Sequence, residues 1–117
     1  FMGSPPMNIL PAEAVAGGVR IDGTVIPVAG IAPGTPVEAG IRPEDLRLAA
    51  DGLAFRVAFV EELGATRLLH GPLAGTDVAV QVPAGSAPQE GDTVRLAIDA
   101  GALHLFDPAT GRRLAQG

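Results

Sequence analysis

Glycine and proline interrupt the apolar runs of this chain before a helix of ordinary length could form. The 117 residues include 16 glycines and 11 prolines, and these two residue types are the poorest helix formers. They fall between short runs rich in Val, Leu and Ile, with a turn signal every eight to twelve residues or so, as in sheet proteins. The pattern predicts an all-β barrel or sandwich of about nine or ten short strands.

Period-2 alternation and turn signals place the expected strands. Asp22-Gly23 is the strongest short hairpin signal of the chain. The longest apolar run also allows a helix, but Phe55, Val57 and Phe59 share one face at period 2, which favours a single strand. The expected strands are residues 8–15, 19–22, 24–28, 35–41, 46–48, 53–63, 66–69, 77–82, 93–98 and 104–107, with a short return at 112–114.

A strand–turn–strand corner occurs twice in the chain, 57 positions apart. In the first copy Pro43 stops the run 37–41, because its fixed φ and missing N–H exclude it from a strand ladder. Residues 43–46 indicate one helical turn, with proline at the first position and acids near the positive end. Unless composition alone produces the match, the constant offset indicates two related β units, 18–48 and 75–105.

The core is expected to be unusually poor in aromatic residues. Hydrophobic residues make up 47% of the chain, but there is no Trp or Tyr. Val, Leu, Ile and Ala must therefore fill the core, with Phe55, Phe59 and Phe106 as its large members. We interpret residues 1–11 as an extended start or linker segment and residues 12–117 as a single β domain.

Composition excludes several classes of function. The net charge of −5 argues against a nucleic-acid partner, because phosphate binding needs a basic surface. All eight basic residues are Arg, so no Lys is present for a nucleotide-binding phosphate loop. The absence of Cys removes thiolate metal sites and cysteine nucleophiles. No apolar run reaches the ~18 residues of a membrane-spanning helix, so direct membrane insertion is not expected.

No residue set suggests catalysis or metal binding. The two serines, Ser4 and Ser86, lie in Pro/Gly loops and not in a nucleophile elbow. Two histidines stand 34 residues apart without close acid partners in sequence, and a lone His at a strand end usually forms a structural hydrogen bond. Glu61 and Glu62 are neighbours in an expected strand, so they point to opposite faces and cannot share a substrate. We expect no enzyme activity, no metal and no cofactor in this chain.

Several motifs, in order and over nearly the whole chain, resemble one family. The segment 3–8 is similar to the stretch that follows the ATPase domain in maltose-type and glycerol-phosphate-type ABC importer ATPase subunits. Residues 40–44 (Gly-Ile-Arg-Pro-Glu) resemble a motif of that family, as do Glu61-Glu62-Leu63-Gly64 with His70 and the closing segment 103–111. One departure is Asp45, where the family usually has His.

The resemblance implies the C-terminal transport-associated OB (TOBE) domain of such a subunit, with an OB-fold-like β-barrel. It implies an accessory regulatory and dimerisation role in a carbohydrate- or glycerol-phosphate-type importer. The implied partners are a second copy of the subunit, the membrane and ATPase components, and a regulatory protein. ATP and Mg would belong to the preceding ATPase domain. The implied location is cytoplasmic, peripheral to the inner membrane, and the apolar start Phe1-Met2 favours a domain cut from a longer protein.

The candidate interface residues follow from the resemblance and from the rigidity of proline. A plain structural role, as strand caps or linker, is the alternative for the prolines and for the segment 3–8. A second functional reading is a small-ligand domain of the molybdate-binding type, which holds oxyanions with backbone N–H groups and Ser, Thr or Lys. The candidates are Gly3, Ser4, Pro5, Met7, Asn8, Arg42, Pro43, Glu44, Glu61, Leu63, Gly64 and His70.

Overall fold

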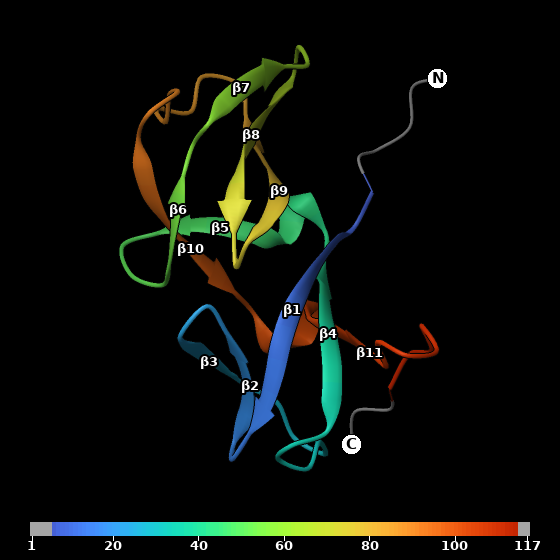
Figure 1. Cartoon of the computed structure of the whole chain (residues 1–117). Coiled ribbons are helices and arrows are strands. Elements are labelled where there is room, and N and C mark those ends of the chain that lie inside the picture. The colour runs from blue at the N-terminus through green and yellow to red at the C-terminus, as the bar shows by residue number, and fades with distance from the viewer. Residues whose placement is uncertain (1–5, 115–117) are drawn as a thin grey trace.

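The computed structural model describes residues 6–114, and this part of the chain is built of β-strands and two single 3₁₀ turns (Figure 1). The predicted all-β class is confirmed, with eleven strands where nine or ten were expected. In chain order the elements are β1 (Asn8–Val15), β2 (Gly18–Ile21), β3 (Thr24–Pro27), β4 (Pro36–Ile41), η1 (Pro43–Asp45), β5 (Leu46–Ala49), β6 (Leu53–Arg56), β7 (Phe59–Glu62), β8 (Thr66–Leu73), β9 (Thr76–Pro83), β10 (Thr93–Ile98), η2 (Ala100–Ala102) and β11 (His104–Phe106).

The strands form three antiparallel sheets. A five-stranded sheet has the order β11-β4-β1-β2-β3, and two three-stranded sheets have the orders β5-β10-β6 and β7-β8-β9. In Figure 1 the β7-β8-β9 sheet lies at one end of the molecule, β1 to β4 lie at the other, and β10 runs between them. None of the helical turns in the described part is long enough to cross a membrane.

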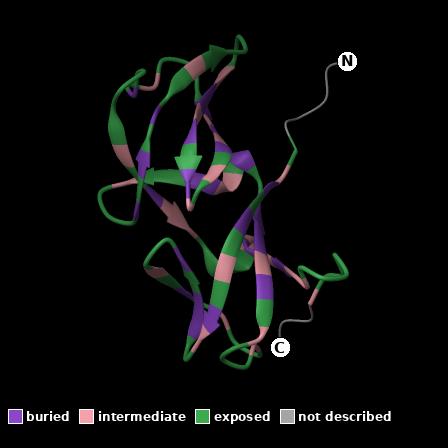
Figure 2. Ribbon diagram, in the orientation of Figure 1, coloured by how far each residue is buried: buried purple, intermediate pink, exposed green. Residues whose placement is uncertain are grey.

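Short aliphatic side chains fill the core, as predicted, and Phe55 is its largest member. Figure 2 shows how buried and exposed residues are distributed along the strands. The prediction is wrong for Phe59, which is 52% exposed. Phe106 is only half-buried, on the outer face of the five-stranded sheet. The largest fully buried side chains are Leu10, Val19, Ile21, Ile41, Leu46, Phe55, Val57, Leu69, Leu73, Leu96, Leu103 and Leu105.

The run 53–63 is two strands and not the expected single strand. The chain leaves the β10 sheet after β6 and enters the β8 sheet as β7. Between them, the N–H of Val57 donates to the carbonyl of Asp92 at 2.8 Å, and the N–H of Ala58 donates to the carbonyl of His70 at 2.7 Å. This crossing changes which face is buried, so Phe55 and Val57 are in the core while Phe59 faces outward.

The two predicted corners have the same local structure. Arg42 before η1 and Asp99 before η2 are both extended, at φ −73°, ψ 149° and φ −75°, ψ 138°. In both turns the third N–H donates back to that extended residue's carbonyl at 2.9 Å. The strands beside the two corners also pair in the same register. β11 pairs with β4 as His104↔Gly40, Leu105↔Ala39 and Phe106↔Glu38. The residues 57 positions away in each strand pair in the same way between β5 and β10, as Arg47↔Ala97, Leu48↔Leu96 and Ala49↔Arg95.

This shared register is the pairing that a pseudo-twofold axis would produce. Upstream the equivalence stops, because residues 18–27 form the β2-β3 hairpin whereas 76–83 form one strand. A common origin of units 18–48 and 75–105 stays a prediction. At the N-terminal end, β1 already pairs with β4 from Asn8 onward, so residues 8–11 of the expected linker lie in the sheet.

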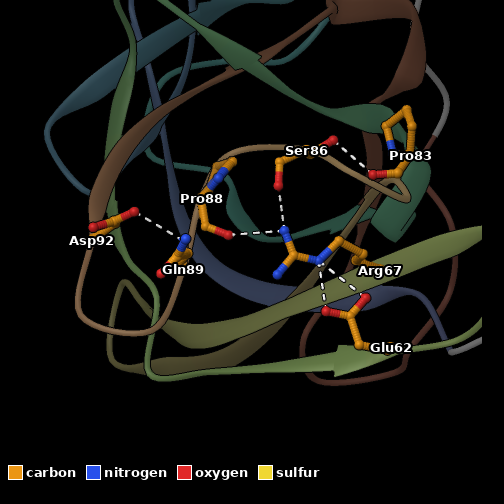
Figure 3. A network of polar contacts seen from close by, with 7 residues as sticks. All are labelled: Glu62, Arg67, Pro83, Ser86, Pro88, Gln89 and Asp92. Atoms are coloured by element: carbon orange, nitrogen blue, oxygen red, sulfur yellow. Dashed lines mark hydrogen bonds and ion pairs between the residues drawn. The ribbon is translucent and has the colours of Figure 1, made fainter.

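Arg67 ties the Pro/Gly loop 84–92 to the β7-β8 hairpin (Figure 3). Its Nε donates to Oε2 of Glu62 at 2.9 Å, and its Nη1 donates to the carbonyls of Ser86 and Pro88. The Arg67 side chain is only 12% exposed. The hydroxyl of Ser86 donates to the carbonyl of Pro83 at 2.7 Å, a local bond that closes the loop.

Candidate interaction surface

The predicted site residues fall into three places in the described part of the chain. Met7, Asn8 and His70 line one cleft, and Glu61 reaches that cleft through its contact with His70. Leu63 and Gly64 lie at the tip of the β7-β8 hairpin. The corner η1 carries Arg42, Pro43 and Glu44. Gly3, Ser4 and Pro5 lie outside the described residues.

The cleft lies between the start of β1 and the sheet β7-β8-β9. Its volume is about 410 Å³, and apolar groups make up most of its wall. Sequence reasoning did not select Asp77 or Ile9, which also line it. The lining residues are Pro6, Met7, Asn8, Ile9, His70, Asp77, Val78 and Ala79.

Asn8 joins the five-stranded sheet to the free edge of β9. Its Nδ2 donates to the carbonyl of Ala79 at 2.9 Å, and the N–H of Ala79 donates to Oδ1 of Asn8 at 3.0 Å. The amide thus satisfies both backbone groups of Ala79 as a neighbouring strand would. Asn8 is the buried polar residue of the described core, at 8% exposure.

We expect Asn8→Ala to lower the free energy of unfolding by about 2 kcal/mol, because it leaves the N–H and carbonyl of Ala79 without partners. Chemical denaturation measures the loss, and hydrogen exchange should show faster exchange of the Ala79 amide. The control is Gln81→Ala, which removes an amide from the same strand that makes no side-chain hydrogen bond within residues 6–114. Equal losses for both variants would contradict a specific role for Asn8.

His70 is held in a fixed orientation by two neighbours. Its ring stacks on Phe59, its cross-strand partner, with centroids 4.4 Å apart and an interplanar angle of 9°. Its Nε2 lies 3.0 Å from Oε1 of Glu61, which is two residues after Phe59 on β7 and therefore on the same face. Glu62 points to the opposite face and pairs with Arg67, as alternation predicts.

The sequence pattern wrongly predicts Phe59 in the core, because residues 53–63 are interpreted as one strand in which Phe59 shares a face with Phe55. A signal was available: Phe59 and Glu61 are two positions apart, so in one strand they share a face. Leu63, at the end of the same hairpin, is 47% exposed. We call Phe59, Glu61, Leu63 and His70 the Phe59 face. Gly64 allows the hairpin to close, since its φ is +90°.

The corner η1 buries its proline and exposes the residue on either side of it. Pro43 occupies the first position of the turn, as predicted, and is buried, while Arg42 and Glu44 are exposed. Just before it, Gly40 lies under Met7 and Phe106, since a Cβ there would come within 2.5 Å of the Met7 sulfur and 2.7 Å of the Phe106 ring. The glycine of the motif at 40–44 therefore lets two apolar side chains cover the sheet.

The polar side chains of this surface are engaged with one another and with the aromatic ring of Phe59. No cluster of three or more metal-ligating side chains occurs within residues 6–114. His70 is engaged by a carboxylate and an aromatic ring, and no serine hydroxyl hydrogen-bonds to it among the described residues. What the surface offers is an apolar cleft beside a stacked aromatic pair.

The described residues thus form a small β-domain of eleven antiparallel strands, with an apolar cleft between the start of β1 and the sheet β7-β8-β9. Residues 39–106 match the family model described as "TOBE domain", and residues 3–46 match that described as "MalK OB fold domain". The chain belongs to the TOBE domain family, and the predicted resemblance is confirmed.

The most informative relatives are import ATP-binding proteins. The chain is 46% identical over 117 residues to the "sn-glycerol-3-phosphate import ATP-binding protein UgpC" of Jannaschia sp. (strain CCS1), covering 97% of this chain and 33% of that protein. The protein of the same name from Ruegeria pomeroyi is 44% identical over 120 residues, covering 99% and 34%. That from Chromobacterium violaceum is 41% identical over 123 residues, covering 97% and 33%. The chain therefore spans about a third of the length of these relatives.

Proposed function

We propose that this chain is the accessory domain of the ATP-binding subunit of an ABC importer of the sn-glycerol-3-phosphate type. The observation that carries the proposal is the match of 97% of the chain to one third of such a subunit. On this proposal the domain is cytoplasmic and reaches the membrane only through the transporter. Nucleotide and Mg²⁺ bind to the ATPase domain, and the membrane and substrate-binding components select the substrate.

The proposed task of the domain is to hold two subunits together through the Phe59 face. Phe59 and Leu63 are 52% and 47% exposed, a large apolar area for neighbouring positions on one hairpin. The Phe59 ring is already fixed against His70, and Glu61 fixes His70. Binding through a pre-ordered aromatic side chain costs little conformational entropy, and aromatic residues often dominate interface energies.

We expect light scattering to show a mass rising with concentration toward twice the 11.8 kDa of the chain. Phe59→Asp should weaken the association at least about tenfold, because it places a charge in an apolar contact. The matched control is Val25→Asp. The Val25 side chain is similarly exposed, at 45%, but lies on β3 in the five-stranded sheet, away from the β7-β8 hairpin. If the chain stayed monomeric at high concentration, both alone and joined to its ATPase domain, the pairing role would fail.

A further inference from the structure

The two corners carry different charges at equivalent positions. Where β5 leaves its corner, Arg47 Nη2 donates to Oδ1 of Asp99 at 2.8 Å. The offset of 57 residues places His104 at the position of Arg47 and Arg42 at the position of Asp99. The carboxylate of one corner is therefore replaced by a guanidinium in the other. Each pair joins one residue from each corner: Arg47 with Asp99 pairs opposite charges, whereas its counterpart, His104 with Arg42, brings together groups that are or can become cations.

A further arginine joins this counterpart from the end of the chain. Phe106 forms a bridge with Arg113, and His104 pairs with Gly40 on β4. Directly opposed residues of antiparallel strands share a face, and residues two apart share it too. Arg42, His104 and Arg113 therefore lie on the outer face of the five-stranded sheet, opposite the side that buries Leu103 and Leu105. Arg42 and Arg113 are both exposed.

The charges around His104 are not balanced by an acid in direct contact. Burial lowers the pKa of His104, and Arg113 and Arg42 lower it further, while Asp45 has the opposite effect. Nδ1 of His104 is buried without a hydrogen-bond partner in the described chain. Neither Arg42 nor Arg113 forms an ion pair within residues 6–114, in contrast to Arg20, Arg47 and Arg67.

We propose that Arg42, His104 and Arg113 form a binding site for a small oxyanion of the phosphate class. Two guanidinium groups present planar sets of N–H donors that match phosphate oxygens, and a protonated imidazole would add a third positive charge. A cleft of about 270 Å³, lined by Ile9, Glu38, Phe106 and Gly111, opens on the same face. The site is separate from the Phe59 face, which lies on the sheet β7-β8-β9.

Binding at this site must be coupled to the protonation of His104. An anion between the guanidinium groups would cancel the repulsion that now disfavours the imidazolium, so the pKa of His104 should rise when the anion binds. By linkage, the anion should bind more tightly as pH falls through the His104 titration. Two carboxylates near the site would repel the anion. Asp45 acts electrostatically on the His104 imidazole, and Glu38 lies on β4 two positions before Gly40, the residue that pairs with His104.

The test is an NMR titration of the two imidazoles with inorganic phosphate, compared with sodium chloride at equal ionic strength. We expect a saturable shift of the His104 ring signals and none of comparable size for His70, which Glu61 engages on another sheet. The pH series uses sulfate, because the charge of sulfate is constant near neutrality whereas inorganic phosphate itself changes charge there. The His104 pKa should be higher with sulfate than without it.

Arg42→Gln and Arg113→Gln should each weaken phosphate binding about tenfold or more, the loss of a charge-assisted pair. Arg56→Gln is the matched control, since Arg56 is also exposed and forms no ion pair in the described part, but lies on β6. The variants change only exposed side chains, so folding should persist, and amide spectra verify it. A His104 shift that follows ionic strength alone, or equal weakening by Arg56→Gln, would overturn the site.

Discussion

Replacing Phe55 by alanine is expected to lower the free energy of unfolding by about 3–5 kcal/mol. Phe55 is fully buried and is the largest side chain of the core. Its ring lies against β8, where a Cβ on Gly71 would be 3.2 Å from Cζ of Phe55. Backbone at that contact cannot collapse into the space that the ring leaves, so the cavity should persist.

Phe59→Ala is the matched control for this prediction. It removes the same side chain four residues later, from a position that is 52% exposed, and should cost less than about 1 kcal/mol. Urea denaturation of both variants, followed by circular dichroism, gives the two differences. Equal losses would mean that the crossing between β6 and β7 does not place the two rings as described.

The second large effect is expected for Gly71→Ala, at about 3 kcal/mol or more. A Cβ at this position would lie 2.1 Å from the carbonyl oxygen of Arg56. Backbone cannot rotate away as a side-chain end can, so β6 and β8 would have to separate. That separation would also strain the bond from the N–H of Ala58 to the carbonyl of His70.

Gly101→Ala is the control for the close approach. Gly101 lies in η2, and a Cβ there meets no atom within 4 Å. Its change should leave stability nearly unaltered, because alanine also reduces the entropy of the unfolded chain. A small effect of Gly71→Ala, measured by the same denaturation, would contradict the close approach of β6 to β8.

Local chemistry was enough to predict most of the strands. The limits expected for residues 8–15 and 93–98 match β1 and β10, because alternation and flanking turn residues are local signals. The helical turn at Pro43 was likewise readable from proline at its first position. The offset of 57 residues predicts both corners from the sequence alone, and η1 and η2 lie at these positions.

Tertiary contacts decided what the sequence left open. The run 53–63 has one apolar pattern, but a change of sheet at Val57 divides it into β6 and β7. The strand expected at 66–69 continues to Leu73 as β8. Pro72 fits there because it pairs only with β9, after β7 has ended, so its missing N–H faces no partner strand.

The motifs suggest several candidate surface residues, but they do not indicate which of these residues lie together. Met7, Asn8 and His70 came from motifs, yet their convergence depends on the bond between Asn8 and Ala79, 71 residues apart. The role of Phe59 depends on the crossing just described. Nothing in the sequence singles out Arg113, because the residue reaches the face of His104 only through its bridge with Phe106 on β11.

The most direct test of the proposed contact role is a dilution series of amide NMR spectra of this chain. We predict that concentration-dependent shifts concentrate on β7 and β8, around Phe59, Leu63 and His70, and disappear in Phe59→Asp. Shifts that instead concentrate on β2 and β3, or that persist unchanged in the variant, would contradict the assignment of self-association to this face.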